Sequence, residues 1–201
     1  MLIVKSKYKI AKRLGAAVFE KTQSQKFALS EARAKKPRGG RGGSDYGRQL
    51  LEKQRVRFTY GLSERQLSNY AKAAFAKDNP SLMLHSELEM RADSAAYRAG
   101  FASTRRAARQ MVSHGHITIN GKRITTPSYR VRKGDVISIR EGSRTSPLFA
   151  GLSEPEENRR SVPSWVTVDL NLMRAEVLGE PSYQPLESGL DYSTVFEFYS
   201  R

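Results

Sequence analysis

The residues best suited to chemistry in this sequence are basic, and many of them fall between positions 105 and 132. Arg105 and Arg109 are four residues apart, so a helix would place them on one face, with Arg106 beside them. The same stretch also contains His114, His116, Lys122, Arg123, Arg130 and Arg132. A guanidinium group is planar, permanently charged and able to donate two parallel hydrogen bonds to a phosphate, and a histidine ring can hydrogen-bond to or stack on a base. The set therefore predicts a surface that binds RNA.

A structural role is the alternative for the same arginines. Glu87, Glu89 and Asp93 precede them and could form ion pairs with them, which would leave the other cations as an ordinary solvated face. The acidic residues are too few to neutralise all the basic ones. We therefore expect a net basic surface even where some pairs form.

Metal binding and catalysis find little support in the sequence. His114 and His116 could supply two ligands, but the chain has only one other histidine, His85, and no cysteine, so we expect neither a metal site nor a cofactor. The chain also lacks the G-x-S-x-G pattern of a serine nucleophile and the G-x-x-x-x-G-K-[ST] pattern of a phosphate-binding loop. The sequence thus predicts a protein that is not an enzyme and has no small-molecule substrate.

The net charge of +15 is divided unevenly along the 201 residues. Residues 1–60 hold 16 basic and 4 acidic residues, residues 61–150 hold 15 and 7, and residues 151–201 hold 4 and 9. Such segregation favours a polyanionic partner for the first two parts and a protein contact for the acidic end.

Residues 1–43 are predicted to form a basic, flexible arm. Two Arg-Gly-Gly triplets begin at Arg38 and Arg41, directly after Pro37. Glycine and proline disfavour regular structure, and arginines in such a segment can bind phosphates or stack on bases. Arg38 and Arg41 are therefore candidate RNA ligands, and a plain flexible linker is the alternative.

Membrane insertion and secretion are not expected. Charged residues interrupt every apolar run well before the roughly 20 residues that a bilayer-spanning helix needs. The start of the chain lacks the continuous apolar stretch and small-residue cleavage site of a secretory signal. A chain of this length favours one domain or two small ones.

Helix signals dominate the middle of the chain. Ser44 or Asp45 can cap a helix that ends at Gly61. Ser63 and Gln66 have the spacing of a capping box, which predicts a second helix. The apolar spacing that follows predicts a third helix over residues 81–99.

A short helix and a small sheet are expected next. Thr104 can cap a helix that stops at Gly115, and Asn120-Gly121 is a strong signal for a tight hairpin turn. Strands are predicted over residues 117–119, 122–124, 129–131 and 136–139, with another from Trp165. The fold class is therefore α+β, with a helical domain, a module of two helices packed on a twisted antiparallel sheet, and an extended N-terminal arm.

Three runs of residues carry a resemblance to a known family. They are ELEMRADSAAYRAGF from Glu87, TRRAARQMVSHGHITINGKRI from Thr104, and PSYRVRKGDVI, which ends at Ile137. Their order and spacing resemble the RNA-binding module named after the fourth protein of the bacterial small ribosomal subunit. Outside the module, the run SDYGRQLLEKQRVRFTYGLSERQ from Ser44 and the ending EFYSR are similar to the family of that ribosomal protein itself.

The resemblance implies a ribosomal protein of the cytoplasm or of an organelle. It would be a primary binder of small-subunit ribosomal RNA at a junction in the 5′ domain, with roles in subunit assembly and translational accuracy. Its neighbours would be the fifth small-subunit ribosomal protein, other ribosomal proteins and the mRNA where it enters the subunit. The division into domains would be an arm (1–43), a helical domain (44–83, completed by 154–201) and the RNA-binding module (84–150).

The resemblance also implies which residues contact RNA. In the module these are Arg105, Arg106, Arg109, His114, His116 and Lys122, and in the helical domain they are Arg48, Lys53, Arg55 and Arg57.

Two features depart from the family pattern. Many relatives have a zinc-binding cysteine knuckle in the arm, whereas this chain has no cysteine and resembles the zinc-free branch, so RNA and packing would have to hold the arm. Tyr192 stands where relatives usually have Glu, just before a final strand.

Other proteins carry the same module, among them tyrosyl-tRNA synthetases, pseudouridine synthases and small RNA-binding heat-shock proteins. The roughly 110 residues outside the module leave no room for the catalytic domain of either enzyme. The remaining alternative is a stand-alone RNA-binding regulator or RNA chaperone with the same module.

Overall fold

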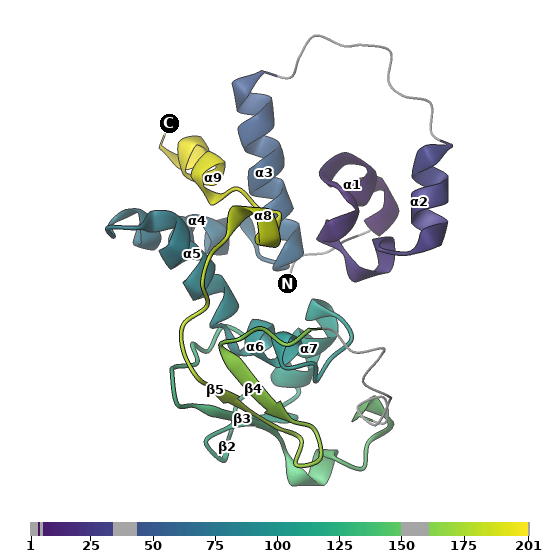
Figure 1. The fold of residues 1–201 in the computed structure, drawn as a ribbon, viewed down its shortest axis with the longest axis vertical. Helices are drawn as coiled ribbons and strands as arrows, with labels where there is room; N and C mark the ends of the chain where they lie inside the picture. The colour runs from purple at the N-terminus through teal and green to yellow at the C-terminus, as the bar shows by residue number, and fades with distance from the viewer. Residues whose placement is uncertain (1–3, 5, 34–43, 150–160, 201) are drawn as a thin grey trace. The chain divides into compact units, whose positions relative to one another are not determined.

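The structure of the chain is a computed structural model that describes residues 4, 6–33, 44–149 and 161–200. The chain divides into two compact units (Figure 1): unit 1 is residues 1–84 and 183–201, and unit 2 is residues 85–182. Unit 1 is helical and unit 2 combines helices with an antiparallel sheet, so the predicted α+β class is confirmed. Within the described ranges, no helix is both long and apolar enough to cross a bilayer.

Unit 1 is built around helix α3 (Asp45–Thr59), which runs beside the C-terminal helix α9 (Tyr192–Tyr199) (Figure 1). Gln49 Nε2 on α3 donates a hydrogen bond to Glu197 Oε2 on α9 at 3.0 Å. The hydroxyl groups of Tyr60 and Tyr192 meet at 3.3 Å in the interior. With the short helix α8 (Pro185–Ser188), the end of the chain therefore belongs to the helical unit.

Side-chain caps begin these helices at the positions that the sequence predicts. Ser44 Oγ accepts a hydrogen bond from the Gly47 amide at 3.2 Å at the start of α3. At the start of α4 (Glu64–Phe75), Ser63 Oγ accepts from the Gln66 amide and Gln66 Oε1 accepts from the Ser63 amide. The predicted cap and capping box are thus confirmed.

Helices α1 (Lys7–Leu14) and α2 (Gln25–Ala32) stand where the sequence predicts an extended arm. The short 3₁₀ turns η1 (Ala16–Val18) and η2 (Glu20–Thr22) connect them. An apolar cluster holds these elements together, made of Ala11, Leu14, Val18, Phe19 and Phe27. The expectation of an arm is corrected for these residues, because apolar side chains at helical spacing between the lysines bury enough area to fold them. Arg38 and Arg41 lie outside the described residues.

The single helix predicted over residues 81–99 is two helices, α5 (Pro80–Glu89) and α6 (Ala92–Arg98). At the break, the Val131 amide donates to the Met90 carbonyl at 2.8 Å, and the Ala92 amide donates to the Tyr129 carbonyl at 2.8 Å. The backbone at the break thus pairs with the segment around residue 130 instead of continuing a helix. The strand predicted over residues 129–131 is accordingly reduced to an isolated bridge between Arg91 and Arg130.

The sheet of unit 2 has the order β2-β1-β3-β5-β4, and each pair is antiparallel. Its strands are β1 (Ile117–Ile119), β2 (Lys122–Arg123), β3 (Val136–Ile139), β4 (Val166–Asp169) and β5 (Arg174–Val177). Helices α6 and α7 (Arg105–Ser113) cover one face of the sheet (Figure 1), and the turn η3 (Glu141–Ser143) follows β3. The core between helices and sheet includes Ala96, Val112, Ile117, Ile137 and Val177.

Two local predictions in unit 2 are confirmed. Thr104 Oγ1 caps α7 by accepting from the Ala107 amide at 3.1 Å. Asn120 and Gly121 both have positive φ, 51° and 76°, in the turn that joins β1 and β2, as a tight hairpin of this kind requires.

The end of the chain does not complete the helical unit as a whole. Residues 166–177 form β4 and β5, and Ile137 of β3 pairs with Ala175 of β5. Alternate residues of these strands, such as Val166 and Val177, are buried in the core of unit 2, which explains why the segment joins the sheet. The domain division expected for residues 154–201 is corrected to this extent.

The expected final strand is helix α9. Asp191 caps it, because Asp191 Oδ1 accepts from the Thr194 amide at 3.2 Å and Oδ2 accepts from the Thr194 hydroxyl at 2.6 Å. Tyr192 is the first residue of this helix and is fully buried.

Candidate nucleic-acid interface

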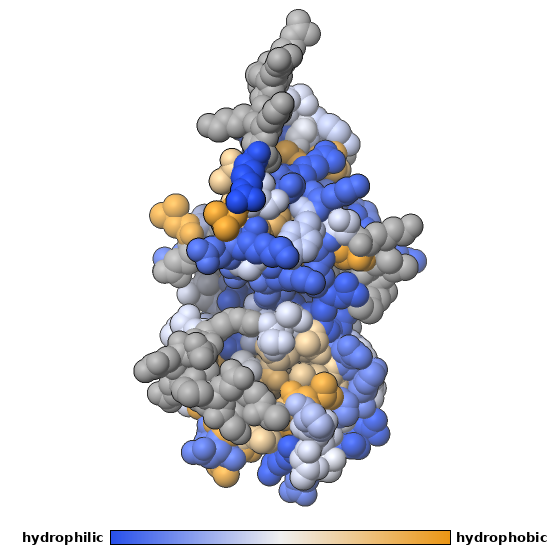
Figure 2. Space-filling view, turned by 90° about the vertical axis from the view of Figure 1, so that its right-hand side faces the viewer, coloured by the Kyte–Doolittle hydropathy of each residue, from blue (hydrophilic) through white to orange (hydrophobic). Residues whose placement is uncertain are grey.

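Unit 2 presents exposed basic side chains from three segments. Arg106 lies on α7, Lys122 and Arg123 lie on β2, and Arg132 lies in the loop before β3. None of the four forms an ion pair with any residue in the described ranges. Together they are the exposed cation set. Figure 2 shows hydrophilic residues over much of the face that it presents.

Asp135 joins the loop of Arg132 to the β1–β2 hairpin. Its Oδ2 accepts from the Arg132 amide at 2.8 Å, and its Oδ1 accepts from Asn120 Nδ2 at 2.8 Å. Asn120 Oδ1 in turn accepts from the Val136 amide at 2.9 Å. These bonds fix the backbone that carries Arg132 against the hairpin that carries Lys122.

Gly115 brings the guanidinium group of Arg123 close to the end of α7. Arg123 Nη2 donates to the His114 carbonyl at 3.1 Å. A Cβ atom at position 115 would lie 2.1 Å from Arg123 Nε, and the φ of Gly115 is +72°. Only glycine fits this position without displacing the Arg123 side chain.

His114 and His116 lie near the same end of α7. Their ring centroids are 6.0 Å apart, and His114 is exposed. His116 Nδ1 lies 3.0 Å from Ser143 Oγ, and its ring meets Phe149 edge-on at 6.2 Å. Burial lowers the pKa of His116, and the positive charges of His114, Arg140 and Arg123 lower it further. The ring of His116 is therefore neutral at pH 7, with one nitrogen held by Ser143.

Inside unit 2, two carboxylates form ion pairs with four arginines. These six residues are called the arginine–carboxylate cluster. Its members are Glu89 and Asp93 with Arg91, Arg98, Arg105 and Arg109. Glu89 accepts from Arg98 Nε at 2.7 Å and from Arg105 Nη2 at 2.9 Å. Asp93 accepts from Arg91 Nε at 2.9 Å and Nη2 at 2.8 Å, and Arg109 Nε lies 3.7 Å from its Oδ2.

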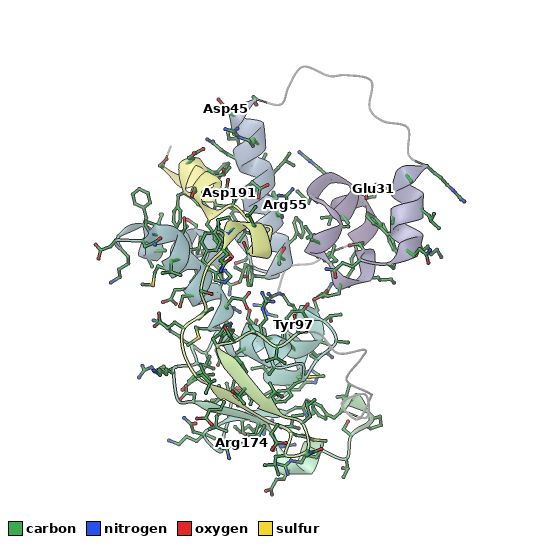
Figure 3. The ribbon with its side chains drawn as sticks, in the orientation of Figure 1. Glu31, Asp45, Arg55, Tyr97, Arg174 and Asp191 are labelled. Atoms are coloured by element: carbon green, nitrogen blue, oxygen red, sulfur yellow. The ribbon has the colours of Figure 1, made fainter. Side chains whose placement is uncertain are left out.

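The side chains of Arg105 and Arg109 are only 13% and 15% exposed. Arg105 Nη1 also donates to Ser94 Oγ at 3.2 Å, and its guanidinium stacks on the Tyr97 ring at 4.7 Å; Figure 3 labels Tyr97 on α6. The two arginines are thus held by acidic partners, as the structural alternative predicts, while their neighbour Arg106 remains exposed.

Arg130 is intermediate between these two groups. Its Nη1 lies 2.9 Å from Glu87 Oε1, and half of its side chain is exposed. It therefore belongs to the surface of unit 2 but carries a local counter-charge.

The four basic residues predicted on α3 do not form one surface. Lys53 is buried, with its Nζ 2.7 Å from Glu64 Oε1 and 4.2 Å from the centre of the Phe198 ring. Arg55, labelled in Figure 3, donates to the Leu14 carbonyl at 2.8 Å and pairs with Glu52. Lys53 and Arg55 therefore tie α3 to neighbouring elements of unit 1.

The other two differ in exposure, since 66% of the Arg48 side chain is exposed but only 22% of the Arg57 side chain. Arg57 Nε is 3.8 Å from Glu64 Oε2, and its Nη1 donates to Gln54 Oε1 at 3.1 Å. Arg48 is exposed and pairs loosely with Asp45 at 3.3 Å.

Glu64 is the acidic centre of this part of unit 1. Burial raises its pKa, but hydrogen bonds from Lys53 and Tyr199 and the charges of Lys53 and Arg57 outweigh burial, so the pKa lies below the ordinary value of 4.5. Tyr199 Oη donates to Glu64 Oε1 at 2.9 Å, and burial raises the pKa of Tyr199. Glu64 thus stays charged and forms ion pairs with both Lys53 and Arg57.

The sequence predicted Glu89 and Asp93 as possible ion-pair partners of the arginines, but it did not single out Tyr97. The spacing of residues gives no sign that the Tyr97 ring lies against Arg105, because that contact forms only when α6 and α7 pack together. No group of three or more histidine, aspartate or glutamate side chains that could hold a metal ion occurs among the described residues.

Two family descriptions match adjoining parts of the chain. The S4 domain matches residues 90–137, and the ribosomal protein S4/S9 N-terminal domain matches residues 3–89. The first match ends within β3, so the pair formed by β4 and β5 lies beyond it.

Similar proteins cover nearly the whole chain. The small ribosomal subunit protein uS4 of Aquifex aeolicus is 40% identical over 96% of this chain and 95% of its own length. That of Herpetosiphon aurantiacus is 39% identical over 96% of both chains, and that of Ligilactobacillus salivarius is 45% identical over 79% of this chain and 78% of its own. With this identity over almost its full length, and with the S4 domain built from α6, α7 and the first strands of the sheet, the chain belongs to the uS4 family of small ribosomal subunit proteins.

Proposed function

We propose that this protein is a structural constituent of the small ribosomal subunit that binds small-subunit ribosomal RNA directly. The observation that carries the proposal is the exposed cation set, which lies inside a chain that belongs to a ribosomal protein family. Exposed cations without acidic partners are available to phosphates, and each phosphate contact releases counterions from the RNA. The proposal assigns the protein no catalytic step.

The finer parts of the proposal follow from the same family membership. The protein binds a junction in the 5′ domain of the RNA, acts early in subunit assembly and contributes to translational accuracy. Its protein neighbours include the fifth small-subunit protein, and the mRNA enters the subunit nearby. It works on cytoplasmic or organellar ribosomes.

The RNA-binding residues of this proposal are Arg106, His114, His116, Lys122, Arg123, Arg130 and Arg132, with Arg48 on α3 and Arg38 and Arg41 in the segment that follows α2. Arg105 and Arg109 contribute from within the arginine–carboxylate cluster. Lys53, Arg55 and Arg57 have structural partners in unit 1, so they are less suited to bind RNA.

Salt dependence of RNA binding tests this proposal. Affinity for a 5′-domain RNA fragment is measured by filter binding at several salt concentrations, for the parent protein and for Arg106→Gln, Lys122→Gln and Arg132→Gln combined. The slope of log K against log salt is negative, and each lost phosphate contact makes it shallower by about 1. We therefore expect the slope of the triple variant to be shallower by about 3.

A matched control removes three exposed cations from α4 and the residues after it. Arg65, Lys72 and Lys77 are exposed and form no ion pair within the described ranges. Changing all three to Gln removes the same net charge and is expected to alter the slope much less. An equal change of slope in both triple variants would mean that the exposed cation set is not the interface.

The alternative is a stand-alone RNA-binding regulator or RNA chaperone that uses the same module. Such a protein would bind RNA with a similar salt dependence but would not remain in washed small subunits. Cofractionation therefore separates the two functions.

A further inference from the structure

The arginine–carboxylate cluster places acidic side chains directly beneath a surface proposed to bind a polyanion. Glu89 is 1% exposed and accepts hydrogen bonds from Arg98 and Arg105. By charge alone, a buried carboxylate at this position weakens the attraction for phosphate. We therefore expect Glu89 to have another role that compensates for the weaker attraction to phosphate.

The contacts of Arg105 indicate what that role is. The guanidinium group is held by Glu89 Oε1 at 2.9 Å, by Ser94 Oγ at 3.2 Å and by the Tyr97 ring at 4.7 Å. These contacts come from α5 and α6, whereas Arg105 begins α7. A long side chain that is mobile in solution is thereby fixed before any ligand arrives.

Arg98 is fixed by the same carboxylate. Its Nε and Nη2 donate to the two oxygens of Glu89 at 2.7 and 2.9 Å, and 37% of the side chain is exposed. One carboxylate therefore orients two guanidinium groups from two different helices, and one of the two reaches the surface.

We propose that Glu89 is a positioning residue for RNA recognition, which holds the guanidinium groups of Arg98 and Arg105 in the orientation that a specific RNA phosphate arrangement requires. Side chains ordered in advance lose less conformational freedom on binding, so affinity and discrimination rise even though the local charge falls. The inference rests on the proposed function and extends it to specificity.

The two possible roles of Glu89 predict opposite results for Glu89→Gln. If the carboxylate acts only through its charge, its removal strengthens binding to every RNA. If it positions the arginines, its removal weakens binding to the cognate RNA by about tenfold, the equivalent of one charge-assisted hydrogen bond. Binding to an unrelated RNA duplex does not weaken, since that binding needs charge alone.

Glu87→Gln is the matched control. Glu87 lies on the same helix and pairs with a single arginine, Arg130, whose side chain is half exposed. The change removes the same charge without loosening Arg98 or Arg105. We expect it to strengthen binding slightly to both RNAs.

The experiment measures affinities for a 5′-domain fragment of small-subunit ribosomal RNA and for an unrelated duplex of equal length, using the full chain. The expected result is a fall in the ratio of the two affinities for Glu89→Gln and no fall for Glu87→Gln. Equal or tighter binding of the 5′-domain fragment by Glu89→Gln overturns the inference while leaving the proposed function intact. A parent protein that does not distinguish the two RNAs contradicts the proposed function, and the inference fails with it.

Ser94→Ala keeps the experiment decisive if Glu89→Gln does not fold. It removes the hydrogen bond from Arg105 Nη1 without any change in charge. We expect the affinity ratio to fall about threefold. In a double-mutant cycle with Arg105→Lys, the loss of affinity in the double variant should be smaller than the sum of the two single losses. An unchanged ratio would overturn the inference.

Discussion

At the residue scale, the chemistry of this protein depends on which of its cations have acidic partners. Arg106 and Arg109 are three residues apart on one helix, yet one is exposed and the other is held near Asp93. The sequence predicted both as RNA ligands, because spacing alone cannot tell which side of a helix faces a buried carboxylate. The packing of α6 against α7 makes that choice.

Gly115→Ala is expected to reduce both stability and RNA affinity. The φ of +72° costs an L-residue about 1–2 kcal/mol, and the new Cβ atom displaces the Arg123 guanidinium. Gly100→Ala is the control, since its φ is +80° with open space around the missing Cβ. Thermal unfolding should show a loss of stability in both variants, whereas filter binding should show a loss of RNA affinity only in Gly115→Ala. Equal affinities in the two variants would count against a role for Arg123.

His85 is expected to make stability fall in mild acid. Burial lowers the pKa of His85 below 6.5, and the charges of Arg98 and Arg105 act in the same direction while Glu89 opposes them. Protons therefore bind His85 more readily in the unfolded chain than in the folded one. Above pH 6.5 His85 does not lower the free energy of unfolding, and below that value it lowers it increasingly as the pH falls. Urea unfolding of the parent at about pH 7.5 and about pH 5.5 should show this decrease.

His85→Gln should make that decrease smaller. The control is His114→Gln, because His114 is exposed. If His85→Gln leaves the difference between the two pH values unchanged, the burial of His85 does not govern it.

At the scale of elements, the N-terminal helices differ most from what the sequence predicts. The lysines and the glycines near position 40 favour an extended arm, but Ala11, Leu14 and Val18 have helical spacing. Leu51 and Phe58 of α3 pack against this cluster. A cluster of apolar side chains thus holds α1 and α2 in a chain without cysteine, which is the packing role expected where no zinc knuckle is present.

Phe27→Ala tests the role of this cluster. Phe27 is fully buried on α2, and removal of a buried phenylalanine ring costs about 3–5 kcal/mol. Hydrogen exchange should become faster in α1 and α2, while the amides of the unit 2 sheet remain protected. Leu29→Ala, on the same helix but 52% exposed, should have little effect. Uniform acceleration in both units would contradict a local role for the cluster.

At the scale of the whole molecule, the fold class and the identity of the module could be read from the sequence, because caps, turns and apolar spacing are local signals. Ser63 with Gln66 and Asn120 with Gly121 are examples in which local chemistry determines the element. The break after Glu89 and the pairing of β4 and β5 with β3 depend on contacts distant in sequence. Such contacts leave no local pattern in the sequence, so neither the domain division nor the burial of Lys53 could be predicted from it.

The structure shows which of the basic residues of the molecule are paired with acidic side chains and which are exposed. Part of the basic excess pairs with Glu64, Glu89 and Asp93 inside the two units. The exposed cation set is therefore smaller than the composition suggests, but its members have fixed backbones. That arrangement suits recognition of a shaped RNA better than general attraction to polyanions.

The most direct test of the central claim is the amount of this protein in purified small ribosomal subunits of its source. Subunits are washed in high salt to remove loosely bound factors, and the protein is quantified against other small-subunit proteins by mass spectrometry. The proposed function predicts about one copy per subunit after the wash, because a structural constituent is held by many contacts at once. Loss of most of the protein into the wash would contradict it and would favour a stand-alone RNA-binding regulator.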